Sequence, residues 1–196
     1  FFKQKTAYEI PKRDWSSDVC SSDLEKLVAA MLELVREGEV TPCAEAVAAR
    51  AGVGLRTVFR QFQDMEALYA GMALRLAEEY ADWLDPFVAA DWRGQLAEMT
   101  ARRLATFERL IPFKRAADAH RHASPTIQRN HRETLARMRQ RLVGLLPPDI
   151  ADDPVRRETI DLMLSFETWL RLRLDQGLSA DAARGVVVAA VDRLIA

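Results

Sequence analysis

Residues of the kind that bind DNA bases and phosphates gather in one short stretch of the chain. They are Arg56, Thr57, Arg60 and Gln61, and positions four residues apart share one side of a helix. Arginine can pair with guanine, glutamine can pair with adenine, and threonine can contact phosphate or the thymine methyl group. The pattern favours a helix face that reads DNA, while a solvated polar face is the ordinary alternative.

The same stretch carries apolar residues that predict an inward-facing side. They are Leu55, Val58, Phe59 and Phe62. Their spacing of three and four residues is typical of a helix that packs on one side. A helix that is apolar on one side and bears arginine, threonine and glutamine on the other is suited to the major groove of DNA.

A glycine turn precedes this segment. Gly52 can adopt the positive φ angle that ends a helix, Val53 can fill the angle between two helices, and Gly54 begins the second one. Before the turn, apolar residues between Val47 and Ala51 predict a first short helix. Two short helices joined by such a turn form a helix-turn-helix, whose second helix enters the major groove.

The stretch from Val47 to Leu68 resembles the DNA-binding signature of TetR-family transcriptional regulators. The shared pattern is Val-Ala-x-x-Ala-Gly-Val and then Thr-Val-Phe-x-x-Phe, followed by an acidic residue and a leucine, here Glu66 and Leu68. The resemblance implies an all-α fold with an N-terminal three-helix DNA-binding domain and a C-terminal helical domain. It also implies a homodimeric repressor that binds a palindromic operator in double-stranded DNA and is released by a small-molecule ligand.

The expected DNA contacts combine the polar face with neighbouring positions of the signature. They are Arg56, Thr57, Arg60, Gln61, Phe59, Gly54 and Thr41. The sequence departs from the usual family pattern, which has Ser at Gly54, Tyr at Phe59, often His at Gln61 and often Lys at Met65. Since Phe59 has no hydroxyl group and Met65 has no charge, two common phosphate contacts are absent. Binding should therefore depend more on Arg56, Thr57 and Arg60.

The composition is that of a globular protein with one large or two small domains. The chain has 196 residues, of which 49% are hydrophobic and 29% charged, and its net charge is -1. A near-neutral total does not exclude DNA binding, because binding depends on the local charge. No apolar run approaches the roughly 20 residues of a membrane span, and the amino end lacks the apolar segment of a signal peptide. Two cysteines, Cys20 and Cys43, suit the reducing cytoplasm.

The chain divides into three parts by pattern. Residues 1–24 show neither helical nor strand periodicity and resemble a translated sequencing-adapter run, so we expect a non-native segment; a natural disordered arm is the alternative. Residues 25–71 are the expected helix-turn-helix domain, with a first helix that begins near Leu24, capped by Ser22 or Asp23. Residues 72–196 are the expected ligand-sensing and dimerisation domain.

Helix boundaries follow from proline, glycine and capping residues. The boundaries are Thr41–Pro42, Asp64, Pro86, Pro112, Ser124–Pro125, Pro147–Pro148, Pro154, Gly177 and Ser179. We expect Pro112 to interrupt a helix that begins at Trp92, because proline lacks the backbone N–H that an inner turn requires. No segment alternates with the period of two that indicates a strand, so the sequence predicts an all-α protein.

The resemblance implies a small-molecule site between the middle helices. Its expected lining is apolar, as such sites require, and ordinary packed core is the alternative for each residue. The expected lining residues are Leu96, Met99, Phe107, Phe113, Met138 and Leu142. The ligand itself cannot be read from these residues.

Wide apolar faces on the last two helices predict a dimer interface. Two DNA half-sites match a two-fold axis, and the resemblance implies a four-helix bundle made by both subunits. The expected interface residues are Phe166, Trp169, Val187 and Val191. The alternative is that both faces belong to the core of one protomer.

The sequence offers little support for an enzyme or a metal site. His120, His122 and His131 are not paired at ligand spacing with cysteine or acidic residues, so they are expected at the surface. No catalytic triad, phosphate-binding loop or paired carboxylate motif is present, and we expect no cofactor. A helical protein-interaction module and an all-α enzyme remain as alternatives. A basic face built by Arg50 with the two arginines of the motif would oppose the first, and a polar cavity would support the second.

Overall fold

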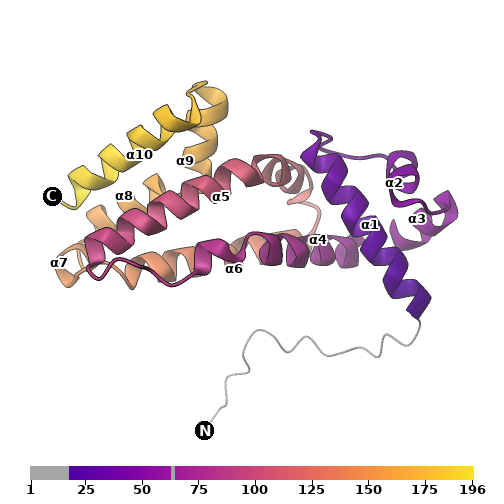
Figure 1. Cartoon of the computed structure of the whole chain (residues 1–196), viewed down its shortest axis with the longest axis horizontal. Coiled ribbons are helices and arrows are strands. Elements are labelled where there is room, and N and C mark those ends of the chain that lie inside the picture. Colours follow the sequence, from indigo (N-terminus) through magenta and orange to yellow (C-terminus); the bar gives the residue numbers. More distant parts are fainter. Residues whose placement is uncertain (1–17, 63–64) are drawn as a thin grey trace, which may run out of the picture.

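The computed structural model describes residues 18–62 and 65–196. All regular secondary structure in these ranges is helical (Figure 1). The first unit contains α1 (Asp18–Arg36), α2 (Ala44–Ala51), α3 (Leu55–Phe62) and α4 (Met65–Glu79). A 3₁₀ turn, η1 (Ala81–Leu84), follows. The second unit contains α5 (Trp92–His120), α6 (Pro125–Val143), α7 (Pro148–Ala151), α8 (Pro154–Met163), α9 (Phe166–Leu170), the π-helical turn η2 (Arg171–Asp175) and α10 (Ala180–Leu194). The all-α prediction is confirmed.

Two apolar cores organise these helices. The first lies among α1–α4, which we call the helix-turn-helix unit, and α1 is its centre, because it is buried on several sides. The second lies among α5–α10, which we call the body. Figure 1 shows the two units at opposite ends of an elongated molecule, and they are joined by the packing of α4 on α6 and of α1 on α5.

The first helix begins earlier than the sequence predicts. It starts at Asp18 and includes residues of the segment expected to lie outside the fold, so neither Ser22 nor Asp23 is its cap. Leu24 packs against the first core. Extending a helix that is already fixed by packing adds one hydrogen bond per residue, which explains how a polar stretch without periodicity becomes helical. Residues 1–17 lie outside the described part of the chain.

The structure tests the predicted start of α2 but not the predicted cap of α4. Helix α2 begins at Ala44 with Cys43 at its N-cap and without a side-chain cap bond, so Thr41 and Pro42 belong to the preceding loop and do not begin the helix. The loop is needed because α1 ends near Gly38, whose φ angle of 108° turns the chain. The predicted cap Asp64 lies outside the described residues, and α4 begins at Met65.

The predicted interruption at Pro112 is wrong. Helix α5 continues through this residue as far as His120. Its first part packs in the body through Leu96 and Leu104, and its last part packs in the helix-turn-helix unit through Phe113 and Ala116. Packing at both ends offsets the lost hydrogen bond at the proline, so one helix belongs to both cores.

Two helix N-caps in the body are those that the sequence predicts. The Ser124 hydroxyl accepts a hydrogen bond from the Ile127 N–H, and the Ser179 hydroxyl accepts one from the Ala182 N–H, as predicted. The expected continuous helix after Pro154 is instead divided, because Ser165 caps a new helix through the Thr168 N–H. This break lets α8 and α9 follow different directions around the second core.

A buried arginine forms hydrogen bonds between helices of the body. Arg103 of α5 is only 2% exposed. Its guanidinium donates to the Met138 carbonyl at 2.6 Å and to the Leu164 carbonyl at 3.5 Å, which joins α5 to α6 and to the end of α8. Its Nε has no partner among the described residues. Burial lowers the pKa of Arg103 to about 10, which reflects how unfavourable the charge is in this place.

Replacing Arg103 by methionine should raise the free energy of unfolding by about 1–3 kcal/mol, because an apolar chain of similar length removes a poorly solvated charge. Denaturant titration of the two proteins measures this. The Arg103→Ala variant should be less stable than Arg103→Met, since it leaves a void. A methionine variant that unfolds more easily than the parent would contradict the interpretation.

Candidate nucleic-acid interface

The turn between α2 and α3 has the geometry that the sequence predicts. Gly52 adopts φ 65° and ψ 33°, a left-handed conformation that suits glycine, and ends α2. The Val53 N–H donates to the Ala48 carbonyl at 3.2 Å. The Gly54 carbonyl accepts the Thr57 and Val58 N–H groups at 2.8 and 3.3 Å, so it begins α3. The prediction of a helix end at Gly52 is confirmed.

Helix α3 is held by a narrower apolar contact than expected. Val58 is 1% exposed and packs in the first core. Leu55 and Phe59 are 38% and 53% exposed, so the prediction that they pack inward is wrong. A helix of eight residues offers only a narrow strip to its neighbours, and Val58 fills that strip. The side chain of Phe62 lies outside what the structure describes.

The outward surface of α3 brings most of the predicted DNA contacts together. Arg56, Arg60 and Phe59 are exposed, and Thr57 and Gln61 are half-buried beside them. Gly54 is exposed at the start of the helix. Thr41 lies apart from this set, in the loop between α1 and α2, where it helps to line a cavity. The exposure of Phe59 adds an aromatic ring to a surface that is otherwise polar.

Helix α3 carries two of the basic side chains of the unit, Arg56 and Arg60. Between residues 22 and 79 the sequence has ten acidic and six basic side chains, so the unit as a whole carries no broad basic surface. Arg50 forms ion pairs with Glu37 at 2.7 Å and Glu33 at 3.4 Å, so it does not join Arg56 and Arg60 in the basic face that would oppose a protein-interaction module. Arg60 lies 3.8 Å from Asp23. Within the described ranges, Arg56 forms no ion pair.

A polar contact connects the helix-turn-helix unit to the body. One carboxylate oxygen of Glu66, in the first turn of α4, accepts hydrogen bonds from the Ser124 hydroxyl at 3.0 Å and from the Thr126 N–H at 2.8 Å. It thereby adds a negative charge to the N-terminus of α6, where the helix dipole favours one. Hydrogen bonds from Thr126 and Ser124 lower the pKa of Glu66. The sequence showed Glu66 only as part of a motif, because its partners lie 58 and 60 residues away.

A second set of contacts supports the same junction. Arg36 of α1 donates to both carboxylate oxygens of Glu79, at 2.9 and 3.1 Å, and so joins α1 to the end of α4. The same guanidinium lies 5.5 Å from the centre of the Phe113 ring of α5. Three helices therefore meet around one arginine, which sequence spacing could not reveal.

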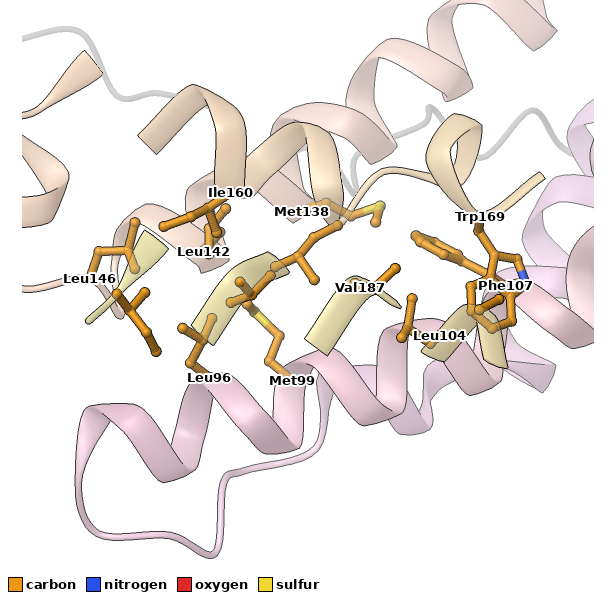
Figure 2. Close-up of a cluster of buried hydrophobic side chains, with 14 of the residues drawn as sticks. Leu96, Met99, Leu104, Phe107, Met138, Leu142, Leu146, Ile160, Trp169 and Val187 are labelled. Carbon is orange, nitrogen blue, oxygen red and sulfur yellow. The ribbon is translucent and has the colours of Figure 1, made fainter. Parts of the chain in front are cut away.

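Most of the predicted ligand-binding residues lie in the packed core of the body. Figure 2 shows Leu96, Met99, Phe107, Met138 and Leu142 directed into one cluster of buried side chains. Phe113, the remaining member of the predicted set, lies elsewhere and lines a cavity of about 180 Å³ between the two units. This cavity thus lies at the junction of the units.

The predicted dimer residues also lie inside a single protomer. Trp169, Val187 and Val191 are buried in the core of the body, where Figure 2 shows Trp169 close to Phe107. The half-buried Phe166 ring packs on Phe107 with their centres 4.6 Å apart. These side chains have little surface left for a partner. Exposed apolar residues are found instead at other positions of the same helices: Val155, Leu162, Leu174, Val186 and Val188.

Two further features bear on the alternatives. Among the described residues, no group of three histidine, cysteine or acidic side chains is arranged to hold a metal ion. His131 lies 3.2 Å from Arg121, and burial lowers its pKa. No helix in the described ranges is both long and apolar enough to span a membrane.

The geometry defines an all-α protein with an N-terminal helix-turn-helix. Its fold is similar to the crystal structure of SCO7518, a candidate transcriptional regulator from Streptomyces coelicolor A3(2), with a TM-score of 0.60. The two sequences are 20% identical, and the match covers 88% of this chain and 98% of SCO7518. At this identity the likeness concerns the fold. No protein-family model matches the chain, and no curated protein matches it.

Replacing Glu66 by glutamine should lower the denaturant midpoint at pH 7. A carboxylate whose pKa is lowered in the folded state stabilises that state above its unfolded pKa of about 4.3, and this contribution is lost as the pH falls through the lower folded value. The difference between parent and variant should therefore shrink at acidic pH. Chemical denaturation at both pH values measures it.

The matched control is Glu78→Gln, on the same helix but exposed. It should unfold like the parent at both pH values. Equal midpoints for Glu66→Gln and the parent at pH 7 would mean that the carboxylate does not stabilise the junction.

Proposed function

We propose that the protein is a DNA-binding transcriptional regulator of the TetR type. The observation that carries the proposal is the surface of α3, where Arg56, Phe59 and Arg60 project from a helix that Val58 anchors behind a glycine turn. The similar fold of a candidate transcriptional regulator supports it. We further propose that it acts in the cytoplasm and has no catalytic role.

The surface of α3 offers contacts of two kinds. Arg56 and Arg60 can donate paired hydrogen bonds to guanine, and they can also neutralise phosphates. Thr57 and the exposed ring of Phe59 can contact a sugar or a thymine methyl group. Because the surrounding unit is rich in acidic residues, most of the attraction to DNA must come from these two arginines.

A palindromic operator follows from a homodimer. Two α3 helices related by a two-fold axis read two half-sites when they lie about 34 Å apart, or a multiple of that distance. We propose that residues 25–71 form the DNA-binding domain and that residues 72–196 form the domain for dimerisation and ligand sensing. A ligand that prefers another relative position of the units would shift the population away from DNA and so relieve repression.

We place the dimer interface on exposed apolar residues of α8 and α10, and not on the residues singled out by sequence. Val155 and Leu162 are seven positions apart, which puts them on one side of α8, and Val186 lies on the outer part of α10. Exposed apolar side chains that gather on neighbouring helices are typical of protein interfaces. Helices α8 and α10 pack against each other, so their outer sides can form one surface.

Replacing Arg56 or Arg60 by alanine should weaken specific DNA binding by about 1–3 kcal/mol, which corresponds to roughly 5- to 150-fold in affinity. The operator is first selected from a random pool with the parent protein, and fluorescence anisotropy then measures affinity at several salt concentrations. Loss of one arginine that contacts phosphate should also reduce the salt dependence by about one ion.

Arg75→Ala provides the matched control, since Arg75 is an exposed arginine of α4 outside α3. Its affinity should equal that of the parent. Selection that returns no enriched sequence would contradict DNA recognition and favour a protein-interaction module. Unchanged affinity of both α3 variants would contradict the assignment of this face.

Replacing Leu162 by glutamate should convert the proposed dimer to a monomer, because a charge would be buried without a partner at the interface. Light scattering after size-exclusion chromatography measures the mass. Leu162 is 57% exposed, so the change should not disturb the core of the protomer. Val88→Glu, at an 88% exposed loop position, is the control and should leave the mass unchanged. A parent that is itself monomeric would contradict the dimer.

A further inference from the structure

The cavity between the two units is formed by both of them. Met31 and Val35 come from α1 and Met72 from α4, while Phe113 comes from α5 and Ile127 from α6. Its volume is about 180 Å³. It therefore lies where the helix-turn-helix unit meets the body, and it is separate from the packed cluster of Figure 2.

The lining of the cavity suits an uncharged aromatic molecule. None of its lining residues is an aspartate, glutamate, lysine or arginine. Met31, Met65 and Met72 contribute sulfur atoms, which make favourable contacts with aromatic rings, and Phe113 offers a ring surface. An ionised ligand would lose its hydration here without gaining an opposite charge.

A few polar groups stand at the edge of this apolar lining. The Tyr69 and His120 rings lie with their centres 5.8 Å apart, and Asn130 also lines the cavity. Within the described part of the chain, the Tyr69 hydroxyl, the His120 ring and the Asn130 amide have no hydrogen-bond partner. They can therefore bind one polar substituent of a ligand and orient its ring, as a few placed polar groups do in small-molecule sites.

The volume sets the size of the ligand. A cavity of about 150 Å³ lined by apolar residues is large enough to hold benzene, whereas sites for drug-sized molecules begin at about 300 Å³. The present cavity is close to the smaller value. A single ring with a short substituent fills it.

We propose that this cavity binds an uncharged, single-ring aromatic molecule with one hydrogen-bonding substituent, and that its binding changes the affinity of the protein for DNA. The second half rests on the proposed function. The ligand contacts helices of both units, and Met65 and Thr126 at its border adjoin the two sides of the Glu66 link. A bound ring thus favours one relative position of α4 and α6, and the position of α3 follows that of α4.

The binding half is tested with 4-ethylphenol as the probe, by isothermal titration calorimetry and protein-observed NMR on the full chain without DNA. Leucine at Ala117 or Ala73 fills part of the cavity from α5 or from α4, and each variant should weaken binding at least tenfold. Two variants are used so that a folding defect in one does not decide the result. The controls Ala119→Leu and Ala77→Leu, at exposed positions of the same helices, should bind like the parent. No saturable binding to the parent, or equal binding by all variants, would overturn the proposal.

The coupling half uses the operator selected from the random pool. Saturating 4-ethylphenol should change the operator affinity of the parent and of Ala119→Leu by about fivefold or more, the lower end of ordinary allosteric coupling. The same concentration of 4-ethylphenol should leave the operator affinity of Ala117→Leu unchanged. Equal operator affinity with and without a demonstrably bound probe overturns the regulatory role. A chain that binds the probe but selects no DNA contradicts the proposed function and supports the site alone, so the two failures are distinguishable.

Discussion

Phe113 lies in the core of the helix-turn-helix unit, although the first part of its helix belongs to the body. It can do so because α5 continues through Pro112, where one backbone hydrogen bond is lost. Burial of a phenylalanine side chain contributes about 1.5–3 kcal/mol, which is comparable with the loss at an inner proline of about 3 kcal/mol. The placement of the helix-turn-helix unit on the body depends on this one continuous helix, and the polar contacts add to the packing that it provides.

Polar contacts then determine how the units are oriented. Apolar packing alone permits several rotations of one helix on another, whereas a carboxylate that caps a helix must face its N–H groups. Glu66 imposes that condition between α4 and α6, whereas Arg36 fixes α1 against α4 within the helix-turn-helix unit. The pairing of Arg50 with Glu37 has a complementary effect on the surface. It neutralises a charge beside α2 and leaves Arg56 and Arg60 as the basic groups that distinguish α3.

Features that depend on adjacent residues could be predicted from the sequence better than features that depend on tertiary packing. The turn at Gly52 and the caps at Ser124 and Ser179 depend on a few adjacent residues, so they could be predicted and are confirmed. Pro112 could not be interpreted from its neighbours, because the packing that keeps α5 helical through it comes from α1. The burial of Phe59 and of Trp169 could not be predicted from the sequence either. Periodicity identifies an apolar residue but not its depth, and Phe59 is exposed while Trp169 is buried.

The position of the cavity follows from how the two cores form. Side chains within one core can adjust to each other until they are close-packed, and the expected lining residues in the body have done so. At the junction, α1, α4 and the last part of α5 are held by the first core, whereas α6 is held by the second, so their facing surfaces cannot adjust freely. The space that remains touches both units. A ligand changes an equilibrium only when it distinguishes its states, and contacts to both units distinguish their relative positions directly. A ligand within the body would have to act on α3 through the deformation of a packed core, whereas one at the junction contacts both units directly.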